Sequence, residues 1–457
     1  MKRMVFFHKT PAAWNKSKNF AKSPSTISSL EKMKGNYPKF TPSSEMKEFF
    51  ETDIYFQMCK QICSRMGIKE LHIVHGFMET EGRNWSVYGQ KGQCMIDQMS
   101  TYWCVMNPED LLGFMDSSIV FTRGNYPILH QWMEKNHSPL EKIWIHYPAT
   151  SLRFPHLETF SNSITKRLKN LDKSPIINNM LTGMCIEHEI NIDLDLKSNQ
   201  ELFTAIINKL IAARKSIHEN PYNIVLVDDQ YNAQTLAEMF PNSMIQKFVK
   251  PALWGDGIIL HARQYDLIYC GTTLQETKNL QAFIQLMKYL DLDSERKLKI
   301  VIAGNKKGNA ILASFFSTPF SNLEIINKGE VSRKELQSLF TQSKVMLVTS
   351  GRDANPRIIQ ESLVQGARVI AINTLSDGLE FLSANPLLGS VIDSDVEKWS
   401  YSRNGNLEFR PTVLLASQIS DEIQKSDYPD LVAKISRKRL SIEECISPLY
   451  GLLNSFK

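Results

Sequence analysis

Two carboxylates bracket the predicted start of a helix in the stretch TSGRDANPRIIQESLVQGA, residues 349–367. Asp353 lies in the loop before the helix, and Glu361 lies eight residues later, inside it. Asn355 suits the N-cap and Pro356 the first helical position, because proline has no N–H to leave unpaired. The free N–H groups and the positive dipole end of such a helix favour a phosphate.

The chemistry of these residue types suits a nucleotide-linked sugar, because carboxylates accept pairs of hydrogen bonds from sugar hydroxyls. A second interpretation fits the stretch equally well: a capped strand–helix unit with a solvated glutamate and a loop aspartate. The decision between them depends on the elements around the stretch.

The C-terminal half alternates apolar runs with amphipathic helices. A helix with a regular apolar stripe is predicted to follow the first run, and another helix is predicted over 332–340. Gly366 suits the end of the helix that carries Glu361. This alternation predicts a parallel, doubly wound sheet with a ligand at the carboxyl ends of its strands. The predicted strands are 265–271, 297–304, 323–327, 345–350, 367–372 and 390–393.

The N-terminal half contains similar pieces, with helices predicted over 43–67 and 200–219. Residues 251–263, which contain Pro and two Gly and show no clear period, are predicted to be the hinge. We therefore expect two Rossmann-like α/β domains facing a cleft, 1–255 and 256–430, followed by a C-terminal helix in 431–457 for which packing on the first domain is left open. The predicted strands are 3–9, 70–76, 118–124, 142–148, 223–229 and 244–250.

The composition of the 457 residues, 42% hydrophobic and 22% charged, is that of a globular protein with more than one core. No apolar run is long enough to span a membrane, and the N-terminus lacks a signal-peptide core. Seven scattered cysteines without a C-x-x-C pair make structural zinc improbable and favour a reducing cytoplasm. No nucleic-acid module is present.

The net charge of +5 is concentrated in residues 1–50, which hold ten Lys or Arg against three Glu. Such a segment can attract an anionic membrane surface or an acidic acceptor, but a solvated, partly flexible terminus is the favoured interpretation. The expected location is the cytoplasm, with peripheral attachment at the inner face of a membrane left open.

Four motifs in the C-terminal half occur together in the order and at the distances of a known family. They are GTTLQETKN (271–279), VIAGN (301–305), IINKGEVSRKELQSLF (325–340) and DANPRIIQES (353–362), and SDGLEFL (376–382) follows them. Over residues 265–382 the chain resembles the retaining GT-B glycosyltransferases of family 4, the glycosyl transferases group 1. In the N-terminal half, KIWIHYP (142–148) resembles the strand that brings a histidine, here His146, into the cleft of those enzymes.

The resemblance implies roles for individual residues. His146 and Asp353 would be catalytic, with Asp353 on the hydroxyls of the transferred sugar and Glu361 on those of the ribose. The base would bind near residues 327–331. The donor-binding residues implied by the resemblance are Gly271, Thr272, Lys278, Gly304, Val331, Asn355, Pro356, Arg357, Ile358 and Glu361.

Two positions depart from the family pattern. Asp353 stands where the family usually has glutamate, so the carboxylate is one methylene shorter. Thr272 stands where it usually has arginine, which removes a partner of the diphosphate. Lys278 is kept, and Arg352 or Arg357 would supply the missing charge.

The resemblance implies an enzyme of the hexosyltransferase type that moves a sugar from a nucleotide diphosphate sugar to a hydroxyl of a carbohydrate, lipid-linked or other acceptor. It implies retention of configuration, no metal ion and no cofactor beyond the co-substrate. Two alternatives stay open: a sugar-nucleotide epimerase of GT-B fold, and a degenerate GT-B protein that only binds or scaffolds.

Overall fold

We analysed a computed structural model of the chain. The chain divides into two units; the first holds the N-terminal sheet and residues 446–457, and the second holds residues 249–445. Within the described residues, no helix combines the length and the apolar character needed to cross a membrane. The structure describes residues 3–7, 44–75, 91–96, 99–105, 118–123, 142–147, 223–227, 233, 237, 240, 242–254, 257–271, 278–304, 310–350, 357–373, 379–393, 400–401, 407–408, 411–425 and 427–456.

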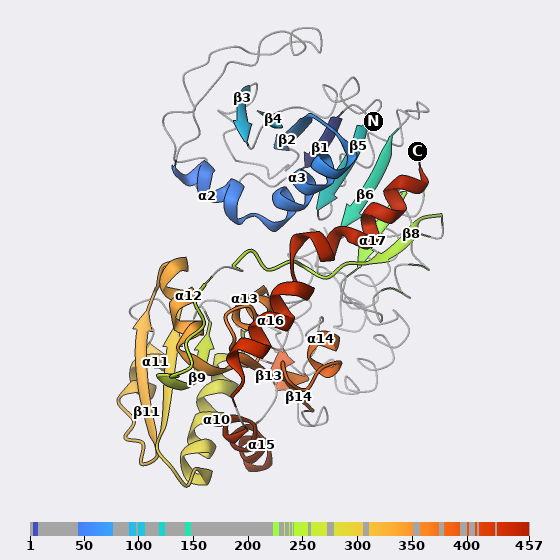
Figure 1. The fold of residues 1–457 in the computed structure, drawn as a ribbon. Helices are drawn as coiled ribbons and strands as arrows, with labels where there is room; N and C mark the ends of the chain where they lie inside the picture. The colour runs from blue at the N-terminus through green and yellow to red at the C-terminus, as the bar shows by residue number, and fades with distance from the viewer. Residues whose placement is uncertain are drawn as a thin grey trace, which may run out of the picture. The chain divides into compact units, whose positions relative to one another are not determined.

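The second unit is built on a six-stranded sheet in which all neighbours are parallel (Figure 1). Counted along the chain, its strands lie in the order third, second, first, fourth, fifth, sixth, which is the doubly wound order of a dinucleotide-binding fold. The strand order reverses between the first and fourth strands. The strands are β9 (Tyr265–Cys270), β10 (Leu298–Ala303), β11 (Leu323–Gly329), β12 (Ser343–Val348), β13 (Arg368–Asn373) and β14 (Gly389–Asp393).

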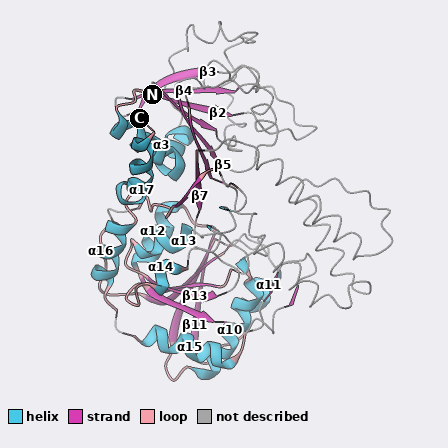
Figure 2. Cartoon of the chain, turned by 90° about the vertical axis from the view of Figure 1, so that its right-hand side faces the viewer, coloured by secondary structure: helices cyan, strands magenta, loops and turns pink. Residues whose placement is uncertain are grey.

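Helices cover both faces of this sheet (Figure 2). On one face, α10 (Leu280–Asp293), α11 (Ala310–Phe316) and α15 (Val413–Gln424) pack on alternate strand residues such as Leu267 and Tyr269. On the other, α12 (Arg333–Thr341), α13 (Arg357–Leu363), α14 (Glu380–Ser383) and α16 (Pro429–Arg439) pack on residues such as Ile268. The predicted doubly wound sheet is therefore confirmed, and the six predicted strands match it within two residues at nearly every end.

The first unit has an eight-stranded sheet that is parallel except for one edge. All six predicted strands are present, and an unpredicted antiparallel pair, β3 with β4, forms the edge. A further pair, β15 (Ser400–Tyr401) with β16 (Leu407–Glu408), lies in the second unit. The strands of the first sheet are β1 (Arg3–Phe7), β2 (Glu70–His75), β3 (Lys91–Ile96), β4 (Met99–Val105), β5 (Ser118–Arg123), β6 (Ile143–Tyr147), β7 (Ile224–Val227) and β8 (Met244–Lys247).

The helix predicted over 43–67 is two helices, α2 (Ser44–Thr52) and α3 (Ile54–Met66). The break falls at Asp53, whose extended backbone and carboxylate cap α3 by accepting the N–H groups of Tyr55 and Phe56 at 3.0 and 2.8 Å. An aspartate in this position competes with helix continuation and starts a new helix instead. The helix predicted over 200–219 lies outside the described residues.

Among the described residues, the chain passes into the second unit between residues 248 and 249 and back into the first between 445 and 446. Residues 251–263 were predicted to be a hinge, yet Trp254 is buried in the core of the second unit and Ala252 donates its N–H to the Leu440 carbonyl at 2.9 Å. At the other crossing, α17 (Ile442–Ser455) reaches the first unit, where Arg65 lies over the ring of Tyr450. The predicted domain boundaries remain predictions.

Candidate functional site

Two glycines end neighbouring strands at the carboxyl edge of the second sheet. Gly271 follows β9 and Gly304 follows β10, and the Gly271 N–H donates to the Ala303 carbonyl at 3.2 Å. Gly304 has a φ of +86°, and a Cβ there would lie 3.6 Å from the Gly271 carbonyl oxygen. Glycine at both positions keeps the backbone at this edge open, which is what the close approach of a ligand to the main chain requires.

The backbone that carries Lys278 is fixed by the two strands between which the strand order reverses. The Tyr269 hydroxyl, on β9, donates to the Lys278 carbonyl at 3.0 Å, and the Thr349 hydroxyl, just after β12, donates to it at 2.9 Å. Ligands of doubly wound sheets bind at this reversal, outside the carboxyl ends of the strands. Lys278, the cation predicted to bind phosphate, therefore lies where the fold favours an anionic ligand.

Glu361 lies partly buried on α13, and burial raises the pKa of its carboxyl, while Arg357 and Arg333 act in the opposite direction. Its charge also reaches Cys270 at the end of β9: burial is the main reason that the pKa of this thiol is raised, Glu361 adds to the effect, and Lys278 opposes it. Glu361 and Lys278 therefore both act on the end of β9, although 83 positions separate them in the sequence (361 − 278).

Arg333, at the start of α12, is held above the ring of Trp254, with its guanidinium carbon 4.7 Å from the ring centre. An arginine over an indole ring is attracted by the negative face of that ring. Since Arg333 also acts on the carboxyl of Glu361, it adds a second cation next to Arg357. No sequence pattern singles out Arg333, because an arginine in the first turn of an amphipathic helix is usually a solvated residue.

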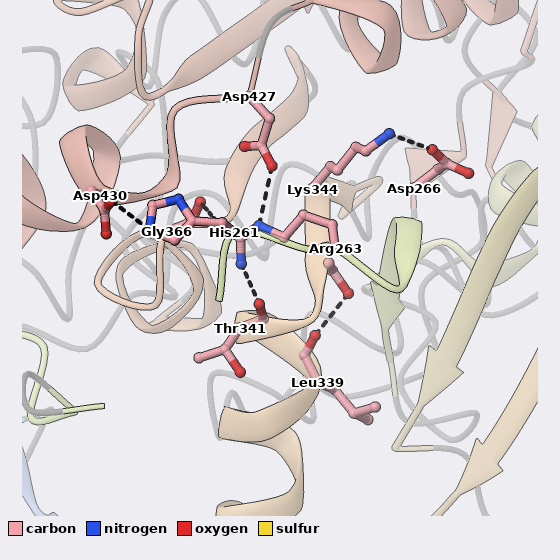
Figure 3. Close-up of polar contacts among 10 residues, drawn as sticks. His261, Arg263, Asp266, Leu339, Thr341, Lys344, Gly366, Asp427 and Asp430 are labelled. Atoms are coloured by element: carbon pink, nitrogen blue, oxygen red, sulfur yellow. Dashed lines mark hydrogen bonds and ion pairs between the residues drawn. The ribbon is translucent and has the colours of Figure 1, made fainter. Parts of the chain in front are cut away.

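The other end of α13 is held by a buried arginine (Figure 3). Arg263 donates from Nε to Asp427 at 3.1 Å, from Nη2 to the Gly366 carbonyl at 2.7 Å, and from Nη1 to the Thr341 carbonyl. Gly366 has a φ of +81°, which confirms it as the residue that ends the helix, and a Cβ there would lie 2.7 Å from the Pro429 carbonyl oxygen. This contact network fixes α13 relative to α12 and α16.

A second arginine completes the anchorage. Arg437, on α16, donates from Nε to the Val364 carbonyl at 2.9 Å and from Nη2 to the Gly257 carbonyl at 2.5 Å. The Gln365 amide donates to the Trp254 carbonyl. The residues that follow α13 are thus bonded to residues near both ends of the segment 249–445. This anchorage positions Glu361, which lies five residues before Gly366.

The predicted site residues divide into three groups. Gly271, Lys278, Gly304 and Glu361 come together at the carboxyl edge of the second sheet, as described above. Val331 and Ile358 pack against the apolar core on the α12–α13 face, and Arg357 is exposed at the start of α13. Outside the described residues lie Thr272, Asp353, Asn355 and Pro356, and also most of the basic segment 1–50, namely residues 1–2 and 8–43. Their roles stay predictions.

His146 lies in the first unit, on β6, and is 3% exposed. Its Nδ1 is 3.0 Å from the Thr122 hydroxyl, which also accepts the indole N–H of Trp144 at 3.0 Å. Phe240 packs edge-on against the imidazole. Thr122 and Phe240 thereby fix the ring orientation, and the catalytic role of His146 stays a prediction.

Within the described ranges, no three His, Cys, Asp or Glu side chains gather as ligands for a metal ion. Among the described residues, the charges that act on the carboxylate of Glu361 are those of Arg357 and Arg333. What this arrangement offers chemically is a partly buried hydrogen-bond acceptor for hydroxyls beside cations for an anionic group.

Comparison with known proteins gives this geometry a context. Residues 259–386 match the model of the family glycosyl transferases group 1. No curated protein matches the sequence. Among solved structures, sucrose-phosphate synthase from Thermosynechococcus elongatus aligns with a TM-score of 0.50 and 9% identity, covering 100% of this chain and 98% of that one.

A trehalose-phosphate synthase (UDP-forming) from Burkholderia xenovorans, solved with glucose 6-phosphate, gives a TM-score of 0.50 and 8% identity and covers 100% of both chains. TarM from S. aureus gives a TM-score of 0.44 and 12% identity over 76% of this chain, which spans only 58% of the length of TarM. The predicted GT-B architecture is confirmed, and so is the predicted enzyme class at the level of the family model. Residues 259–386 of this chain are thus similar to the glycosyl transferases group 1, and they belong to a fold with two Rossmann-like sheets.

Proposed function

We propose that this protein transfers a sugar from a nucleotide diphosphate sugar to an acceptor hydroxyl, with retention of configuration and without a metal ion. The observation that carries the proposal is that Lys278, whose carbonyl Thr349 holds at the strand-order reversal, and Glu361 both act on Cys270 at the end of β9, inside the segment that matches the group 1 family. A cation and a carboxylate at one strand end suit a ligand that contains both phosphates and hydroxyls.

In the proposed reaction the bond between the anomeric carbon and the diphosphate oxygen breaks, and a bond to the acceptor oxygen forms on the same face of the sugar. The acceptor proton leaves with the diphosphate, so the products are a glycoside and a nucleoside diphosphate. Lys278, together with Arg357, stabilises the negative charge that develops on the leaving group. Glu361 binds the ribose hydroxyls, Asp353 the hydroxyls of the transferred sugar, and His146 acts on the acceptor side.

The test is a panel of sugar nucleotides, including UDP-glucose and GDP-mannose, assayed for binding by calorimetry and for turnover with and without acceptors. We expect one donor to bind, turnover to require an acceptor, and excess EDTA to leave the rate unchanged. Loss of activity in EDTA that Mg²⁺ or Mn²⁺ restores would overturn the metal-independent mechanism. Turnover without acceptor would indicate an epimerase, and failure to bind any nucleotide diphosphate would indicate a scaffold.

Replacing Glu361 by glutamine should separate stability from binding. Because burial raises the pKa of this carboxyl, the folded protein resists its ionisation. The wild type therefore has its full stability below the unfolded pKa, near 4.5, and loses part of it as the pH rises through the folded value. Glu361→Gln removes this loss, so its free energy of unfolding should equal that of the wild type at pH 4 and exceed it at pH 7.5.

The same variant should bind both the donor and the free nucleotide more weakly, because a neutral amide is a poorer acceptor for two ribose hydroxyls. Urea unfolding at the two pH values and calorimetric titration measure the two effects. A variant that is less stable at pH 7.5 and binds nucleotide normally would show that Glu361 serves the fold instead of the donor.

A further inference from the structure

The side chain of Asn279 is buried next to Lys278, and none of its polar atoms is paired. The residue is 3% exposed, and neither Oδ1 nor Nδ2 has a hydrogen-bond partner. It precedes α10, a helix of 14 residues, but its amide caps none of the free N–H groups there. The buried amide of Gln365 donates a hydrogen bond to the Trp254 carbonyl, whereas the buried amide of Asn279 makes no hydrogen bond.

An unpaired buried amide is costly, because each polar group removed from water loses its hydrogen bonds there without gaining new ones. The ordinary use of asparagine before a helix is to accept an N–H of the first turn, which needs an extended backbone. Asn279 instead has the left-handed conformation, with a φ of 54° and a ψ of 52°. This backbone turns the residue away from the capping role, so capping does not explain the choice of asparagine.

The main chain at this position is held by other residues. Thr349 donates to the carbonyls of Lys278 and Asn279 at 2.9 and 3.4 Å, and Tyr269 donates to the former. A left-handed residue whose side chain serves no purpose would be better replaced by glycine, which adopts this conformation without strain. The position is therefore fixed by its neighbours, while its carboxamide remains unused by the fold.

We propose that the Asn279 carboxamide recognises the sugar hydroxyls of the nucleotide diphosphate sugar, an inference that rests on the proposed function. The amide presents an acceptor and two donors. A phosphate has only acceptors and would leave Oδ1 unpaired, whereas two neighbouring hydroxyls can both donate to Oδ1 and accept from Nδ2. Asn279 follows Lys278 directly in the chain. The hydroxyls that it contacts therefore belong to the transferred sugar, next to the diphosphate.

The decisive variant is Asn279→Gly, which keeps the left-handed backbone and removes only the amide. We expect its melting temperature to equal or exceed that of the wild type, because the unpaired polar atoms are gone. Its affinity for whichever of UDP-glucose and GDP-mannose the wild type binds should fall about tenfold, the effect of two lost hydrogen bonds. Its affinity for the matching UDP or GDP should change less than about twofold, which corresponds to roughly 0.4 kcal/mol.

The comparison variant is Lys278→Ala, which should weaken the sugar nucleotide and the nucleoside diphosphate alike. If Asn279→Gly binds both ligands like the wild type, asparagine serves only the backbone conformation and the inference is overturned. Equal losses for both ligands would assign Asn279 to the nucleoside diphosphate that they share and would also overturn it. A wild type that binds neither sugar nucleotide would overturn the proposed function itself, which is a different result from normal wild-type binding with an unaffected variant.

Discussion

Replacing Arg263 by alanine should lower the free energy of unfolding of the second unit by about 3–5 kcal/mol, the cost of breaking a buried ion pair from one side. The Arg263 side chain is 1% exposed, and its partner Asp427 is 18% exposed. One oxygen of that carboxylate already has no hydrogen-bond partner. The variant would leave the other oxygen unpaired as well, together with the carbonyls of Thr341 and Gly366.

A neighbouring ion pair provides the matched control. His261 and Asp430 lie 2.9 Å apart, two residues before Arg263 and three after Asp427, but their side chains are 74% and 61% exposed. Water screens such a pair, so His261→Ala should change the stability by less than about 1 kcal/mol. Urea unfolding of both variants, followed by intrinsic tryptophan fluorescence, to which the buried Trp254 contributes, measures the difference. A loss for Arg263→Ala no larger than for His261→Ala would show that the contacts of Figure 3 contribute little.

Most of the fold could be predicted because parallel strands that are covered on both faces appear in the sequence as uninterrupted apolar runs. Strands such as β9 and β12 are of this kind, with almost every residue buried. The pair β3–β4 was missed for the converse reason. Its sequences, KGQCMI and MSTYWCV, mix polar and apolar residues, and the two residues between them, Asp97-Gln98, are not a recognised hairpin turn.

Residues of the site could be predicted from the sequence only where they belong to a family motif. Lys278 and Glu361 follow from the order of the motifs, whereas Arg263 lies in a segment that was interpreted as a hinge. Its three partners are 78, 103 and 164 residues away along the chain, so local sequence contains no sign of them. Asn279 could have been found from its place before an apolar helix, but the sequence suggests a helix cap there, and only the backbone conformation shows that it is not one.

Replacing Lys278 by alanine should weaken the binding of a nucleoside diphosphate by about 2 kcal/mol, the size of one lost charge-assisted hydrogen bond, or roughly thirtyfold in the dissociation constant. The binding of the corresponding nucleoside should hardly change, since it lacks the phosphates. The reason lies in the position of the lysine: its carbonyl is held by Tyr269 and Thr349, so the side chain starts from a fixed point at the end of β9.

Lys288→Ala is the matched control, because Lys288 lies on the exposed face of α10, the helix that follows Lys278. It removes the same charge from the same part of the chain, so any general electrostatic attraction of the nucleotide is lost equally in both variants. Calorimetric titration with UDP, GDP, uridine and guanosine gives all the affinities needed. If both lysine variants lose the same affinity, the effect is a long-range one that salt would screen, and Lys278 makes no direct contact with the diphosphate. If Lys278→Ala weakens the nucleoside as much as the nucleoside diphosphate, the lysine supports the shape of the site, and the charge on the leaving group must be stabilised by the arginines beside Glu361.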